Sequence, residues 1–222
     1  MGAGKMAARA LVLVLILAAA AGCSALSPKP AVLVEQYTLE YPPPAAAGLK
    51  PLATAILVER FNLARQYDGQ GMVFRPEAFR RQVYNYHRWR ANPADLVADY
   101  LVRDLQASGL FSGVFTNLKP GLARFTLQGG VREFLELDQD GGSLAVVEVE
   151  LSLMDNDQRG LPQRLVFQRS FRHEAAMKEA SAPELARAMS QAMARLSAQV
   201  LGALHQALAA RLAEVPAGAV TK

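Results

Sequence analysis

Arginines alternate with aromatic residues in one short part of the sequence, residues 75–91. This stretch holds five arginines and four aromatic residues but only one acidic residue, Glu77. Arginine and aromatic side chains can stack on single-stranded nucleic acid, and they also dominate the hot spots of protein interfaces. In the alternative, structural interpretation, the tyrosines pack against helices and the arginines keep a strand solvated. The hypothesis worth testing is a partner-binding surface made of Arg75, Tyr84, Tyr86, His87, Arg88 and Trp89.

The remaining candidate residues form no recognisable catalytic or metal motif. His87, His173 and His205 lie on different predicted elements, and the sequence has neither H-E-x-x-H nor a G-x-S-x-G nucleophile elbow. Residues 155–160 begin like a calcium loop, but Arg159 occupies a ligand position and Val166 replaces the terminal glutamate. We therefore expect no catalytic residue, metal or other cofactor, although the sequence alone does not exclude a Ser/His/Asp enzyme.

The single cysteine, Cys23, follows a segment typical of protein export. Two basic residues precede the apolar run Leu11–Ala21, which is shorter than the roughly 20 residues of a bilayer-spanning helix. Residues 20–23 (Ala-Ala-Gly-Cys) resemble the lipobox of bacterial lipoproteins, whose cysteine accepts a diacylglyceryl group, although Ala20 replaces the usual leucine. We expect a signal peptide over residues 1–22 and acylation of Cys23. The alternative is a plain signal peptide with an incidental cysteine.

An acylated Cys23 would hold the rest of the chain at a membrane surface. By resemblance to lipoprotein sorting in Gram-negative bacteria, Ser24 indicates the outer membrane, with the domain on its periplasmic face. Pro28 and Pro30 indicate an extended tether over residues 23–31. With Cys23 acylated, the folded part would contain no thiol, which excludes disulfides, a cysteine zinc site and a cysteine nucleophile.

Length and charge fit one globular domain after this leader. The chain has 222 residues, 51% of them hydrophobic, and a net charge of +4. Without residues 1–22, 200 residues remain, with 22 basic and 20 acidic side chains. This balance is too weak to indicate nucleic acid as a partner, and we expect none. We expect a single domain over residues 32–215, large enough to need no disulfide or metal, and a flexible tail over residues 216–222.

Four strands are predicted before the first helix. Residues 32–41 and 52–61 have strand composition, and residues 72–75 and 81–89 are a pair that turns around Pro76. The helix that follows is capped by Asn92, begins at Pro93 and ends before Gly109. In the first strand, the residues expected to share one face are Leu33, Tyr37 and Leu39.

Three long strands and a long helix are predicted for the second half. The strands cover residues 122–137, 144–154 and 163–173, and Gly129-Gly130 suggests a bulge or bend in the first of them. A capping-box sequence at residues 181–184 starts the helix, whose apolar stripe indicates packing on the sheet rather than a coiled coil. We therefore predict an α+β fold: a mixed, largely antiparallel β-sheet with two main helices packed on one face. The stripe consists of Leu185, Met189, Met193, Leu196, Val200, Leu204, Leu208 and Leu212.

Several short motifs carry a family resemblance. They are residues 72–75 (Met-Val-Phe-Arg), 84–89 (Tyr-Asn-Tyr-His-Arg-Trp) and 108–111 (Ser-Gly-Leu-Phe), together with Pro93 and residues 37–39 (Tyr-Thr-Leu). With the lipobox, these motifs resemble the ABC-type transport auxiliary lipoproteins, the paraquat-inducible protein C-like family. Beyond Leu122 the sequence is similar in pattern more than in residues.

The resemblance implies a non-enzymatic lipoprotein that works with an ABC transporter complex and a periplasmic protein of the mammalian-cell-entry (MCE) type in lipid transport between two membranes. We hypothesise that the arginine and aromatic surface docks the periplasmic MCE-type protein, and a homo-oligomer is also conceivable. Two other classes stay open: an exported enzyme, such as an esterase or a glycan hydrolase, and a regulator of envelope assembly. Fold alone would not decide among them.

Overall fold

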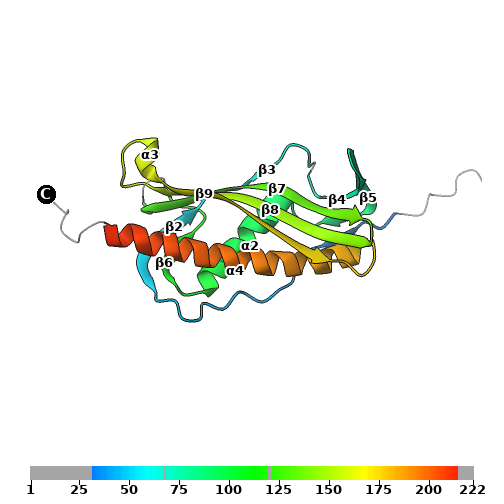
Figure 1. The fold of residues 1–222 in the computed structure, drawn as a ribbon. Coiled ribbons are helices and arrows are strands. Elements are labelled where there is room, and N and C mark those ends of the chain that lie inside the picture. Colours follow the sequence, from blue (N-terminus) through cyan, green and yellow to red (C-terminus); the bar gives the residue numbers. More distant parts are fainter. Residues whose placement is uncertain (1–31, 68, 120–121, 215–222) are drawn as a thin grey trace, which may run out of the picture. The chain divides into compact units, whose positions relative to one another are not determined.

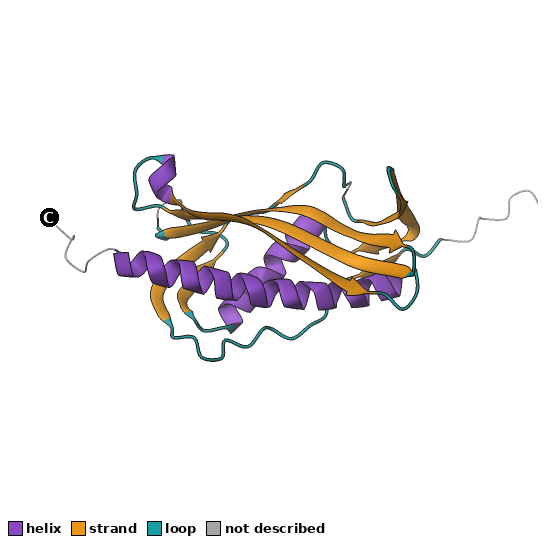
Figure 2. Ribbon diagram, in the orientation of Figure 1, coloured by secondary structure: helices purple, strands orange, loops and turns teal. Residues whose placement is uncertain are grey.

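A mixed β-sheet with its two main helices on one face is the framework of the protein in the computed structural model (Figures 1 and 2). The structure describes residues 32–67, 69–119 and 122–214, which contain nine strands and three helices. All of these elements lie in one compact unit that starts at Val34. The signal peptide, Cys23 and the tether predicted for residues 1–31, and the tail predicted for residues 216–222, lie outside the described residues. The predicted α+β class is confirmed.

Strand β7 (Phe125–Gln139) is the centre of the sheet. β8 (Gly142–Asp155) pairs antiparallel with β7 along its whole length, and β9 (Leu165–Ala176) pairs antiparallel with β8. Strict alternation along β8 gives the strand one fully buried face, while Glu148 and Glu150 lie on the other. These three strands confirm the sequence prediction. The buried face of β8 consists of Ala145, Val147, Val149, Leu151 and Leu153.

Two details of the long strands differ from the prediction. β9 begins at Leu165, two residues later than predicted, and Leu165 is 38% exposed at its very start. Gly129-Gly130 lies in a regular part of β7, and the register shift falls between Val131 and Glu133 instead. A Cβ atom at Gly129 would lie 2.6 Å from the ring of Phe61. Glycine at this position therefore permits a close approach of that ring rather than a bend.

Three short strands follow one another along the other edge of β7, each parallel to it. They are β2 (Leu52–Val58), β3 (Asn62–Leu63) and β4 (Gly71–Glu77). β2 ends three residues earlier than predicted, at Val58, and Phe61 turns into the core instead of extending the strand. The two residues of β3 are too few to produce a periodic signal, so this strand was not predicted.

Three further strands complete the sheet. β5 (Arg80–Trp89) pairs antiparallel with β4, β1 (Glu35–Tyr37) pairs parallel with β5, and β6 (Phe111–Phe115) pairs parallel with β2. The strand predicted over residues 32–41 is thus only three residues long, because just these residues have a partner in β5. Leu39 is buried, but Leu33 is 80% exposed, so the expected common face is wrong for Leu33. β6 was not predicted.

Helix α2 (Pro93–Ala107) forms as the sequence predicts. The side chain of Asn92 accepts a hydrogen bond of 3.0 Å from the backbone N–H of Asp95, and Pro93 occupies the first turn. The helix is followed by Gly109 with φ +63°. Fully buried Asp104 accepts hydrogen bonds from the hydroxyls of Tyr41 and Ser197, which connects α2 to the C-terminal helix.

Helix α4 (Ala182–Glu214) lies along the sheet in front of α2 (Figure 1). Its predicted apolar stripe is buried against β8 and β9, with Leu212 only half-buried, so packing on the sheet is confirmed. The reciprocal capping box is not formed. Glu184 accepts a hydrogen bond from the N–H of Lys178, and the hydroxyl of Ser181 donates to Glu179. The remaining helix, α3 (Leu161–Arg164), is a short turn before β9 that was not predicted.

The apolar residues are divided between the two faces of the sheet. The main core lies between the sheet and helices α2 and α4, which confirms that both main helices pack on one face. A smaller cluster lies on the opposite face, where the chain after β3 covers the end of β4 and β7. There Tyr67 accepts a hydrogen bond of 3.0 Å from the N–H of Phe134. The cluster consists of Tyr67, Val73, Leu135, Leu137 and Val146.

Candidate partner-binding surface

The hairpin formed by β4 and β5 carries all six residues of the predicted binding surface. Because β4 runs parallel to the C-terminal part of β7, with Val73 beside Leu135, the hairpin turn lies at the same end of the sheet as the β7–β8 turn (Figure 1). Pro76 lies within β4, and the chain reverses at Ala78 and Phe79 rather than at Pro76. The predicted strand pair is therefore present, with its turn two residues later.

Trp89 does not belong to the exposed surface. Its side chain has no solvent exposure, and its ring meets that of Phe134 edge-on, with the centroids 5.0 Å apart. It lies in the main core, at the end of β5 where β1 pairs through Tyr37. The assignment of Trp89 as a contact residue is thus corrected: its large apolar ring anchors β5 to the sheet.

Tyr84 is half-buried and bound to a carboxylate that the sequence analysis did not single out. Its hydroxyl donates a hydrogen bond of 2.7 Å to Glu136 of β7, and its ring lies 4.9 Å from that of Phe74. Burial raises the pKa of Glu136 to about 7, although the hydrogen bond from Tyr84 opposes the shift. The pKa of Tyr84 is raised as well, mainly by burial and to a smaller extent by the Glu136 carboxylate. Alternation from Phe134 places Glu136 on the core face, which is the signal that could have revealed it.

His87 lies in a cluster that the pairing of β1 with β5 creates. The hydroxyl of Tyr37 donates a hydrogen bond of 2.5 Å to Glu35 and lies 3.2 Å from Nδ1 of His87, which is itself 3.3 Å from Glu35. Burial and then the Glu35 carboxylate raise the pKa of Tyr37 to about 12. Sequence reasoning missed this cluster because the partners are 50 residues apart and no local pattern reports a parallel pairing of three residues.

The other three predicted residues differ in position. Tyr86 is 54% exposed and Arg88 is exposed, next to Gln36 of β1. Arg75 lies beside Leu137, on the face of the sheet away from the helices. Burial raises the pKa of Tyr67 on that face, and the charges of Arg81 and Arg75 oppose the rise. The structure therefore leaves Tyr86 and Arg88 as the exposed part of the predicted surface on β5.

Polar residues outside the hairpin are engaged in contacts within the fold. His173 lies 2.8 Å from the side-chain oxygen of Gln199, and His205 lies 2.8 Å from the carbonyl of Lys50.

Among the described residues, no group of three or more histidine, cysteine, aspartate or glutamate side chains is arranged to hold a metal ion. No helix within the described ranges is both long and apolar enough to span a membrane.

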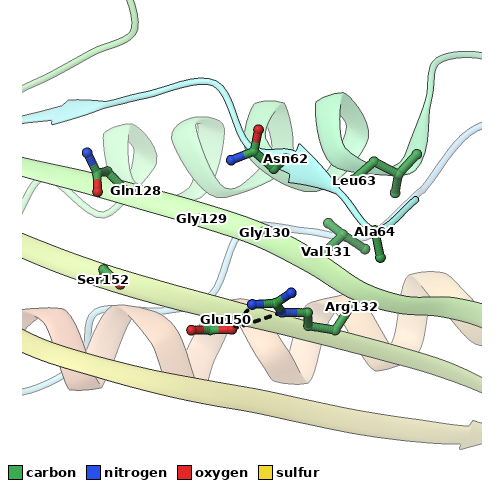
Figure 3. A pocket seen from close by; sticks show the side chains of 10 residues that line it. All are labelled: Asn62, Leu63, Ala64, Gln128, Gly129, Gly130, Val131, Arg132, Glu150 and Ser152. Carbon is green, nitrogen blue, oxygen red and sulfur yellow. Dashed lines mark hydrogen bonds and ion pairs between the residues drawn. The ribbon is translucent and has the colours of Figure 1, made fainter. Parts of the chain in front are cut away.

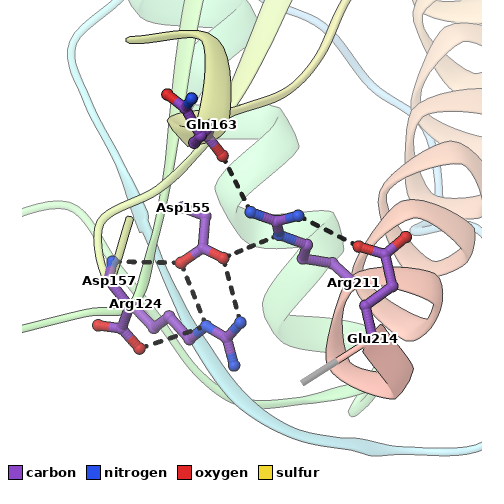
Figure 4. A network of polar contacts seen from close by, with 6 residues as sticks. All are labelled: Arg124, Asp155, Asp157, Gln163, Arg211 and Glu214. Atoms are coloured by element: carbon purple, nitrogen blue, oxygen red, sulfur yellow. Dashed lines mark hydrogen bonds and ion pairs between the residues drawn. The ribbon is translucent and has the colours of Figure 1, made fainter. Parts of the chain in front are cut away.

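Asp155, at the start of the calcium-like sequence, is bound by arginines. Its buried carboxylate accepts hydrogen bonds from Arg124 at 3.2 and 3.1 Å and from Arg211 of α4 at 3.0 Å (Figure 4). Burial would raise the pKa of Asp155, but these hydrogen bonds outweigh it and lower the pKa. Two arginine side chains thus bind the carboxylate, and its role is to hold the C-terminal end of α4 to the sheet.

A shallow groove lies on the face of the sheet away from the helices (Figure 3). It has a volume of about 260 Å³, and the bare backbone of Gly129-Gly130 is part of its lining. The ion pair between Arg132 and Glu150 closes one side. Glu150 also accepts a hydrogen bond from Gln168, and both of its partners lower its pKa. The charged groups of this groove therefore bind one another across neighbouring strands.

Comparison with known proteins places this α+β domain in a class of transport-associated lipoproteins. Residues 37–201 match the family described as ABC-type transport auxiliary lipoprotein component. This match covers most of the chain, and the protein belongs to that family, as the sequence motifs predicted. No curated protein matches the chain.

The fold is shared by solved structures, among them the following two. Protein XCC0632 from Xanthomonas campestris is 20% identical, with a TM-score of 0.67, over 82% of this chain and 98% of that one. The hypothetical protein CT253 from Chlamydia trachomatis is 9% identical, with a TM-score of 0.54, over 72% of this chain and 99% of that one. At these identities the likeness concerns the fold alone.

Proposed function

We propose that this protein is a non-enzymatic auxiliary lipoprotein of an MCE-type ABC transport system that moves lipids between membranes. Acylated Cys23 holds it on the periplasmic face of the outer membrane, where the domain docks the periplasmic MCE-type component. The observation that carries this proposal is the family match over residues 37–201. The lipobox-like residues 20–23 and the following Ser24 support the anchor and the choice of membrane.

The docking contact is assigned to the exposed part of β5. Tyr86 and Arg88 combine an aromatic ring and a guanidinium, the two groups most enriched in interface hot spots. Tyr84 and His87 hold this strand in place through their contacts with Glu136 and Tyr37. Arg75 adds positive charge on the far face of the same hairpin.

Co-purification with the periplasmic MCE-type component encoded beside the transporter tests the docking role. The double variant Tyr86→Ala/Arg88→Ala removes exposed side chains only, so the domain keeps its fold and we expect recovery of the partner to fall about tenfold or more. The matched control is Arg159→Ala/Leu161→Ala, which removes an exposed arginine and an exposed apolar residue at the opposite end of the sheet. Equal recovery with both variants would contradict the docking role.

The anchor is tested separately by mass spectrometry of the protein extracted from membranes. We expect the mature chain to begin at Cys23 and to carry acyl groups on that residue. Density separation of the two membranes should then place the protein in the outer-membrane fraction. A mature chain that begins elsewhere, or an unmodified Cys23, would refute the anchor, and recovery in the inner-membrane fraction would refute the location.

A further inference from the structure

Phe79, at the tip of the β4–β5 hairpin, is more exposed than any other large apolar residue that the structure describes. Its relative exposure is 105%, as in an extended peptide, and its φ angle is +64°. It is also the sole non-glycine residue with positive φ in the described ranges. A turn of this kind prefers glycine or asparagine at that position. The fold thus holds an aromatic ring away from every apolar surface of the domain, at a backbone position that disfavours it.

The groups next to this ring are mainly cationic. Arg80 and Arg81 follow it at the start of β5, and both are exposed. The acidic residue nearest to it in the sequence, Glu77, is bound by Arg80 at 2.9 Å, and the charges of Arg75 and Arg81 both act on Tyr67 on the outer face. Val83, two residues beyond Arg81, is 50% exposed. The tip is therefore a protruding apolar group followed directly in the sequence by two exposed arginines, which complements an anionic phospholipid surface.

The topology directs this tip toward the side from which the chain enters the domain. β1 runs parallel to β5, with Glu35 beside His87 and Tyr37 beside Trp89. The start of β1 therefore points in the same direction as the start of β5, which is the hairpin tip. Cys23 precedes Glu35 by 12 residues, which reach at most roughly 40 Å when extended. A membrane that holds the acyl groups lies within this reach.

We propose that the hairpin tip is a membrane-contact site: Phe79 inserts between the headgroups of an anionic phospholipid leaflet, and Arg75, Arg80 and Arg81 bind the phosphates. This contact orients the domain beneath its anchor, and for that orientation it rests on the acylation of Cys23 in the proposed function. A lipid surface fits better than a protein pocket, because a four-residue tip cannot supply the roughly 800 Å² per partner of a standard protein interface. With the acyl anchor as the first membrane signal, the basic and aromatic tip is the second.

Vesicle co-sedimentation tests the site without the acyl group and without the transport partner. The chain starting at Ser24 keeps the whole compact unit from Val34 onward. It should sediment with vesicles of phosphatidylcholine and phosphatidylglycerol, and Phe79→Gly should lower the partition coefficient about tenfold. The matched control is Leu161→Gly, which removes a 69% exposed apolar side chain at the opposite end of the sheet and should leave partition unchanged. Equal partition of the wild type and Phe79→Gly, including no partition by either, overturns the proposal.

Two further measurements identify the surface that the tip contacts. Partition should fall when phosphatidylglycerol is omitted, and Arg81→Gln should reduce partition only in the anionic vesicles. Partition that does not depend on lipid charge overturns the assigned role of the arginines.

Phe79→Gly should co-purify normally with the periplasmic component, because Tyr86 and Arg88 are intact. Loss of co-purification with unchanged vesicle partition assigns the tip to a protein partner and overturns the membrane contact. Failure of the Tyr86→Ala/Arg88→Ala test, in contrast, leaves the vesicle result unaffected.

Discussion

The buried carboxylates at the two ends of the β7–β8 strand pair differ in how completely they are hydrogen-bonded. At one end, both carboxylate oxygens of Asp155 are occupied, by Arg124 and Arg211 together with the N–H of Asp157 (Figure 4). At the hairpin end, Oε2 of Glu136 receives the hydroxyl of Tyr84, but within the described residues Oε1 has no hydrogen-bond partner. Burial accordingly leaves the pKa of Glu136 raised, whereas the arginines lower that of Asp155.

The difference indicates what each end contributes. The Asp155 network ties the last turn of α4 to the sheet and so closes the fold. The hairpin end instead retains features that cost stability: a buried carboxylate with one oxygen unmatched, and Phe79 in a left-handed backbone conformation. Such features persist where a surface has a role other than stability. This contrast supports assigning contact functions to the hairpin end.

Replacing Trp89 by alanine should have the largest effect on stability. Compared with a change at an exposed residue of β5, it tests which side of this strand is buried. Loss of a fully buried indole ring should reduce the free energy of unfolding by about 4 to 5 kcal/mol. Tyr86→Ala on the same strand should change it by less than about 1 kcal/mol. Urea unfolding of both variants measures the difference. Similar losses for the two would mean that the exposed and buried sides of β5 are assigned wrongly.

Asp155→Ala tests the opposite end. Its removal leaves Arg124 and Arg211 without their shared carboxylate, and we expect a loss of about 3 to 4 kcal/mol in the free energy of unfolding. Asp157→Ala removes a neighbouring carboxylate that is 64% exposed and 3.4 Å from Arg124, so it should cost less than about 1 kcal/mol. If Asp155→Ala were as mild as this control, the network would not be what holds α4.

The sequence predicted the long, periodic strands and helices better than it predicted the β4–β5 hairpin. The long strands, the Asn92 cap and the stripe of α4 are local patterns, and each reports its own burial. The residues of the hairpin share one local pattern but differ in their surroundings: Trp89 is buried in the core, Tyr84 donates a hydrogen bond to Glu136, and Tyr86 is exposed. Composition cannot separate these residues of β5, because the contacts that decide their burial are distant in sequence: β1 pairs with β5, and Tyr84 and Trp89 contact side chains of β7.

Glu136 should make the stability of the hairpin end depend on pH. Its pKa is about 7 in the folded protein, against an ordinary value of 4.5, so its protonated form is favoured by folding. The stabilising effect is complete below pH 4.5 and is lost as the pH rises through 7, by about 3 kcal/mol in total. Glu136→Gln keeps an acceptor for the Tyr84 hydroxyl and should abolish this slope in urea unfolding at a series of pH values. A slope that survives in the variant would have to come from another group.

The smallest predicted change concerns the backbone of Phe79, and it has the opposite sign. Glycine accepts φ +64° without the steric penalty of a Cβ atom, so Phe79→Gly should raise the free energy of unfolding by about 0.5 to 1 kcal/mol. Phe79→Ala also loses the ring but keeps the Cβ atom, and it should give no gain. Thermal and urea unfolding of the two variants separate backbone strain from loss of the side chain. If Phe79→Gly were less stable than Phe79→Ala, the tip would not be strained, and the contrast between the two ends would rest on Glu136 alone.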